Sequence, residues 1–128
     1  MAAMYFDASA LVKRYVAEVG SAWVRRVVAR PVQQVIYTAA LTQRVMHHFA
    51  RRYQVLRLTQ TVVTQACVAL ERHPLRAYDA VQLACALTVW HLMQQRSLVP
   101  PLFVAADDVL LAAAATEGFV VDNPLLHP

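Results

Sequence analysis

The sequence predicts an α/β fold, a three-layer α/β/α sandwich whose mostly parallel central sheet has about four to five strands. Two observations favour this class. Short apolar runs of strand length alternate with segments of helical spacing from one end to the other. Residues 75–90, LRAYDAVQLACALTVW, are apolar almost all the way round, which is typical of a helix buried between other elements.

The first third of the chain reads as strand, helix, helix, strand. A strand at residues 3–6 leads into a helix at 9–17, whose free amides Asp7 or Ser9 could cap. Gly20 breaks the chain, a helix at 21–30 ends before Pro31, and a strand follows at 32–37.

The rest of the chain continues the alternation. A helix that Thr59 or Thr61 could cap reaches Arg72, and Gly118 ends the last helix as its C-cap. The remaining expected helices are 39–53, 75–90 and 108–117, and the remaining expected strands are 55–58, 102–105 and 119–121.

Length and composition indicate one domain, residues 1–128. A chain of 128 residues with 59% hydrophobic side chains can bury a large core without a stabilising disulfide or metal ion. Cys67 and Cys85 both fall in apolar helical pattern, so we expect reduced core residues. No secretory signal or membrane span is recognisable, which predicts a cytoplasmic protein with no membrane partner.

The charge is basic, with a net formal charge of +4. Lys13 is the only lysine among 12 basic residues, so the positive charge comes almost entirely from arginine. This balance favours a polyanionic partner such as nucleic acid, although an acidic protein partner or solubility would explain it equally well.

Three aspartates stand where a parallel sheet places its sites. Asp7 and Asp107 each follow an apolar strand run just before a helix, and Asp79 begins the buried helix. Parallel neighbouring strands would bring their carboxyl ends to one edge, where open parallel sheets bind ligands. Each acid alone also reads as a helix cap or first-turn charge. Their combination favours one shared pocket.

Several other residues have weaker interpretations. Asp108 is either the true helix cap, an exposed neighbour of Asp107 or a substitute ligand. Asp122 follows the last strand and could approach the same edge. His47 and His48 point about 100° apart on a helix, so one metal ion could not easily take both.

The segments YFDASALVKRY, LRAYDAVQLACAL, FVAADDVLLAAAATEGF and VVDNP together resemble the PIN-domain family, in particular the VapC-like toxins of prokaryotic toxin–antitoxin systems. The resemblance touches both ends and the middle, and it covers residues 18–70 weakly. It implies an α/β/α sandwich and a ribonuclease in which four acids hold Mg²⁺ or Mn²⁺. By motif, Asp7, Asp79 and Asp107 correspond to metal-binding catalytic acids, and Ser9 lines the site.

The chain departs from that family at its second acid. The family has a Glu on the third helix, and the matching segment ALTQRVMHHFARR has Arg44 there. No Asp or Glu occurs between Glu18 and Glu71, so a shifted alignment does not supply one. A guanidinium among the carboxylates would neutralise part of the charge that holds a metal, so we expect weak metal binding or none.

Three functions therefore compete. The first is a metal-dependent endoribonuclease, a toxin component with impaired or altered activity. The second is a catalytically inactive PIN-fold protein that binds RNA or an antitoxin protein, which Arg44 and the short segment after Arg52 favour. The third is an assembly role through a homodimer.

Overall fold

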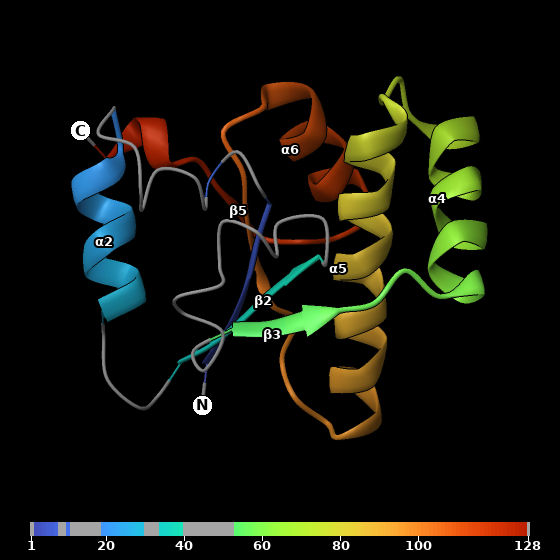
Figure 1. Cartoon of the computed structure of the whole chain (residues 1–128), viewed down its shortest axis with the longest axis horizontal. Coiled ribbons are helices and arrows are strands. Elements are labelled where there is room, and N and C mark those ends of the chain that lie inside the picture. The colour runs from blue at the N-terminus through green and yellow to red at the C-terminus, as the bar shows by residue number, and fades with distance from the viewer. Residues whose placement is uncertain (1, 8–9, 11–18, 30–33, 40–52, 128) are drawn as a thin grey trace.

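A parallel sheet with helices on both faces organises the chain, as seen in a computed structural model that describes residues 2–7, 10, 19–29, 34–39 and 53–127 (Figure 1). The elements are β1 (Ala2–Phe6), α2 (Ser21–Ala29), β2 (Gln34–Ala39), β3 (Tyr53–Leu56), α4 (Gln60–Arg72), α5 (Ala77–Gln95), β4 (Leu102–Val104), α6 (Asp108–Thr116), β5 (Val121–Asp122) and the 3-10 helix η4 (Pro124–Leu126).

The sheet has five strands in the order β3-β2-β1-β4-β5, and all four pairings are parallel. The chain first builds outward from β1 through β2 to β3, and then crosses to the other side of β1 to add β4 and β5. The order of strands therefore reverses between β1 and β4. In open parallel sheets a crevice forms beyond the carboxyl ends of the strands at such a switch point.

Side chains of β1 alternate between two cores, one on each face of the sheet. Met4 and Phe6 pack with Val24 and Val27 of α2, whereas Tyr5 packs into the larger core on the opposite face. In Figure 1, α2 lies on one side of the sheet and α5, with α4 outside it, lies on the other. The predicted three-layer α/β/α sandwich is thus confirmed, because the period of two in a strand divides its residues between the layers.

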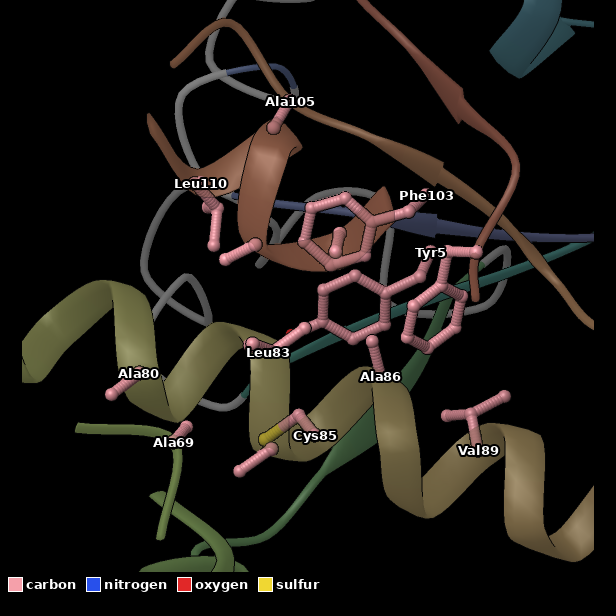
Figure 2. Close-up of a cluster of buried hydrophobic side chains, with 14 of the residues drawn as sticks. Tyr5, Ala69, Ala80, Leu83, Cys85, Ala86, Val89, Phe103, Ala105 and Leu110 are labelled. Carbon is pink, nitrogen blue, oxygen red and sulfur yellow. The ribbon is translucent and has the colours of Figure 1, made fainter. Parts of the chain in front are cut away.

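Helix α5 is the centre of the larger core. Its buried side chains are Ala80, Gln82, Leu83, Ala84, Cys85, Ala86, Val89 and Met93. Figure 2 shows Leu83 and Ala86 of this helix below the stacked rings of Tyr5 and Phe103, whose centroids are 5.5 Å apart. Helix α5 ends at Gln95, five residues beyond the expected end at Trp90. The backbone leaves the helical conformation at Ser97, which adopts a positive φ of 55°.

The two segments that lie mostly outside the described residues are the helices expected at 9–17 and 39–53. Of the first, Ala10 is described and is helical. The bounds expected for the second were wrong, because Ala39 ends β2 and Tyr53 begins β3.

The last strand also begins later than expected. β5 is Val121–Asp122, because Phe119 turns into the core against Trp90, with ring centroids 4.8 Å apart, and does not extend the strand. Gly118 makes this turn possible with φ of +103°, and a Cβ there would lie 2.8 Å from Cη2 of Trp90. Its predicted role in ending the helix is confirmed.

The two cysteines differ in environment. Cys85 is buried, as expected, but Cys67 is exposed, so its assignment to the core was wrong. Helix α4 buries only a narrow stripe against α5, namely Val62, Ala66 and Ala69, and Cys67 lies off that stripe. In the part of the chain that is described, no helix has both the length and the apolar character needed to cross a membrane.

Candidate active site at the sheet edge

Asp7 marks the point where β1 reaches the carboxyl edge of the sheet. Its backbone N–H donates to the carbonyl oxygen of Val104 at 3.0 Å, so pairing with β4 continues one residue past the strand. Its own carbonyl oxygen accepts from the N–H of Ala10 at 3.1 Å. The side chain of Asp7 is only 2% exposed. A buried carboxylate is therefore held directly beside the switch point between β1 and β4.

Asp107 follows β4 at the same edge and caps α6. Its Oδ1 accepts from the backbone N–H groups of Val109 at 2.8 Å and Leu110 at 3.1 Å. Asp107 is thus the true helix cap, and Asp108 is the exposed first residue of the helix. Both of these cap bonds use Oδ1 of Asp107.

Asp79 lies half-buried in the first turn of α5, close enough to Asp107 for their charges to interact. Burial raises the pKa of Asp79, the charge of Asp107 raises it further, and Arg76 opposes both effects. Asp79 in the first turn of α5 and Asp107 at the N-cap of α6 are therefore brought together, although they are 28 positions apart in the chain.

Asp7 is connected to this pair through Tyr78, the neighbour of Asp79 in α5. Burial raises the pKa of Tyr78, and the negative charge of Asp7 raises it further. The same charge also contributes to raising the pKa of Tyr5, after burial and Cys85. Asp7 therefore lies near the first turn of α5, so all three predicted acids surround one edge of the sheet.

The described residues do not form a compact set of metal ligands. Among them, no group of three or more His, Cys, Asp or Glu side chains is arranged to hold a metal ion. Ser9 and Arg44, and also His47 and His48, lie outside the described residues. The chemistry of the donors still fits Mg²⁺, because that ion binds oxygen, keeps several waters and is commonly held by one or two carboxylates.

The two remaining candidate acids have partners of their own. Oδ1 of Asp108 accepts from Nδ2 of Asn123 at 3.4 Å, and the residue borders a hollow of about 410 Å³ between the end of α4 and α6. Asp122 pairs with Nε2 of His127 at 2.8 Å, and the His127 ring stacks on Trp23 of α2 at 4.3 Å. The side chain of Asp122 therefore joins the C-terminal segment to α2.

The structure shows a buried polar pair behind the acids that the sequence did not predict. The hydroxyl of Tyr5 donates to Oε1 of Gln82 at 2.8 Å, and both side chains are fully buried. The spacing of Tyr5 predicts only a core position. The available signal was Gln82 itself, an amide between the apolar residues Val81 and Leu83, three residues after Asp79.

Comparison with known proteins supports the fold. No protein-family profile matches the sequence, and no curated protein matches it. Among solved structures, the chain is similar to one described as a toxin-antitoxin complex from Klebsiella pneumoniae, with a TM-score of 0.57 and 16% sequence identity. The likeness covers 94% of this chain and 97% of that chain. At this level of identity, the comparison shows that the two chains share a fold over nearly their whole length.

Proposed function

We propose that the chain is a VapC-like PIN-domain protein that hydrolyses RNA phosphodiester bonds with the help of Mg²⁺ or Mn²⁺, as an endoribonuclease toxin of impaired or altered activity. The single observation that carries the proposal is that Asp7 and Asp107 follow the neighbouring parallel strands β1 and β4 at one edge of the sheet, with Asp79 close enough to Asp107 for their charges to repel. The similarity in fold to a chain of a toxin-antitoxin complex adds support.

The acids have the properties that a divalent cation requires. Among the described residues, Arg76 opposes the repulsion between Asp79 and Asp107, and a cation between the two acids would relieve that repulsion. Asp79 and Asp107 would hold the ion, and buried Asp7 would add negative charge beside it. When bound, the ion would supply a Lewis acid that lowers the pKa of a water and neutralises phosphate charge.

The protein's own charges favour RNA as the substrate. A net charge of +4, carried almost entirely by arginine, attracts a polyanion. Exposed Arg76 lies at the N-cap of α5, beside Asp79, where it could contact a phosphate next to the bond that is cut. Arginine suits this role because its planar guanidinium can bind two phosphate oxygens at once.

The test is cleavage of structured RNA by the purified chain with Mg²⁺, with Mn²⁺ and with EDTA, beside the variant Asp107→Asn. Asparagine keeps the helix cap but removes the charge. We expect metal-dependent cleavage that Asp107→Asn reduces by at least about tenfold. Cleavage that persists in EDTA, or that Asp107→Asn leaves unchanged, would contradict the proposal.

The second candidate is a PIN-fold protein without catalysis that binds an antitoxin protein or RNA. Arg44, which stands where the resembled family has a Glu, favours it. The variant Arg44→Glu distinguishes the two functions. Metal binding and nuclease activity that appear only in this variant would establish the inactive form, whereas an active native chain would exclude it. Sedimentation of the chain at micromolar concentration would test the proposed homodimer.

A further inference from the structure

We propose that Tyr5 and Gln82 are positioning residues for the acidic site, and that their buried hydrogen bond holds the first turn of α5 at a set place against the end of β1. The inference rests on the proposed function in one respect only, namely that the site binds a divalent cation. It assigns a role to two side chains that lie behind the carboxylates and contact neither water nor substrate.

The pair is placed next to the acids on both elements. Tyr5 precedes Asp7 by two residues in an extended segment, so both side chains point to the same face of the sheet. Gln82 follows Asp79 by three residues, about 4.5 Å along the axis of α5. The bond between Tyr5 and Gln82 therefore joins the two segments that carry Asp7 and Asp79.

The surroundings of the pair explain why a directional bond is needed there. Among the described residues, the side chains packed around the pair are mainly apolar and include Leu83, Ala86 and Phe103 (Figure 2), and the thiol of Cys85 also interacts with the Tyr5 hydroxyl. Apolar contact does not depend on direction, so a helix packed by it alone can shift along the sheet. A hydrogen bond of 2.8 Å tolerates little change in distance or angle, so it fixes this register.

The energetic cost of the pair also indicates a role other than stability. Among the described residues, the buried amide nitrogen Nε2 of Gln82 makes no hydrogen bond of standard geometry, although the Tyr78 side chain interacts with the same amide. A buried donor without an acceptor destabilises a fold, and two apolar side chains of the same shape would fill this space without that cost. The Tyr5–Gln82 pair therefore lowers the stability of the core but fixes the position of α5.

The experiment compares the full-length native chain with Gln82→Met, Tyr5→Phe and the double variant, because methionine and phenylalanine keep the shape of the side chains they replace. Two quantities are measured for each protein: the thermal midpoint of unfolding, and the Mn²⁺ dissociation constant by calorimetry. The matched control is Val89→Ala, which opens a small space in the same helix about two turns beyond Gln82.

We expect both single variants to lower the midpoint and to weaken Mn²⁺ binding by about tenfold or more. The double variant should regain most of the midpoint, because the buried hydroxyl and the buried amide are both removed, yet its Mn²⁺ binding should remain weak. Val89→Ala should lower the midpoint and leave Mn²⁺ binding unchanged. Native Mn²⁺ affinity in the double variant would overturn the proposal, because the pair would then contribute to packing only.

A second measurement keeps the inference testable if the native chain binds no Mn²⁺, a result that would contradict the proposed function alone. Amide hydrogen exchange at residues 80–83, whose N–H groups bond back to the first turn of α5, reports how firmly that turn is held relative to the rest of the helix. In the double variant we expect exchange at these amides to be about fivefold faster or more, with the remainder of α5 unchanged. Equal exchange in the native and double-variant proteins would overturn the inference.

Discussion

Asp107 lies close enough to Asp79 for its charge to raise the pKa of the Asp79 carboxyl, so the N-cap of α6 and the first turn of α5 bring two acids into electrostatic contact. Burial is the larger cause of the shift, and Arg76 partly offsets it. The positive ends of two helices stabilise the acids at this edge, yet the mutual repulsion of the acids remains. The cation that we propose for this site would relieve that repulsion.

The first prediction separates the two roles of Asp107. Asp107→Asn should keep the cap on α6 and leave stability nearly unchanged, whereas Asp107→Ala should cost about 1 kcal/mol because the N–H groups of Val109 and Leu110 lose their acceptor. Both variants should lower the pKa of Asp79, because the repelling charge is gone. Urea unfolding measures the stability, and carboxyl NMR titration measures the pKa. An unchanged Asp79 pKa in both variants would refute the proposed contact.

The second prediction concerns pH. The pKa of Asp79 is raised in the folded chain, so the folded state holds this proton more tightly than the unfolded state. The resulting stability is fully present below the unfolded pKa of about 3.9 and is lost as the pH rises through the folded pKa. Asp79→Asn should therefore be more stable than the native chain at pH 7, and this advantage should disappear near pH 3. Equilibrium urea unfolding at both pH values tests the sign.

The third prediction uses Glu117, whose pKa is lowered chiefly by a hydrogen bond to His73 at 2.9 Å, with a further contribution from Arg72. A lowered carboxyl pKa stabilises the fold above the unfolded pKa of about 4.3, and this stability is lost as the pH falls through the folded pKa. Glu117→Gln should thus cost roughly 1 kcal/mol at pH 7 and little at pH 3. Exposed Glu71 offers the control, because Glu71→Gln should change stability little at either pH.

The fourth prediction distinguishes the two thiols. Burial raises the pKa of Cys85 to about 11, whereas Cys67 is exposed on α4. Only a thiolate reacts quickly with iodoacetamide, so at pH 8 the folded chain should be alkylated once, at Cys67. Both cysteines should react after denaturation in urea. Peptide mass spectrometry identifies the modified residue, and rapid alkylation of Cys85 in the native chain would contradict the buried position of that residue.

The place of the three acids could be predicted in part from the sequence. Asp7 and Asp107 each follow an apolar run that is too short for a helix, and parallel strands necessarily carry such residues to one edge. Their catalytic and metal-binding roles stay predictions. The expectation of a buried Cys67 failed because apolar residues surround it in sequence, while the outer face of α4 packs against none of the described elements.

By itself the sequence determined the alternation of strands and helices, the burial of α5 and the positions of the acids at strand and helix ends, because each follows from local periodicity and capping. Tertiary structure alone decided the strand order that places the switch point between β1 and β4, and it decided the bond between Tyr5 and Gln82, which are 77 positions apart. An apolar pattern predicts that a residue is buried, but it does not predict which distant residue that side chain contacts, because the hydrophobic effect has no direction.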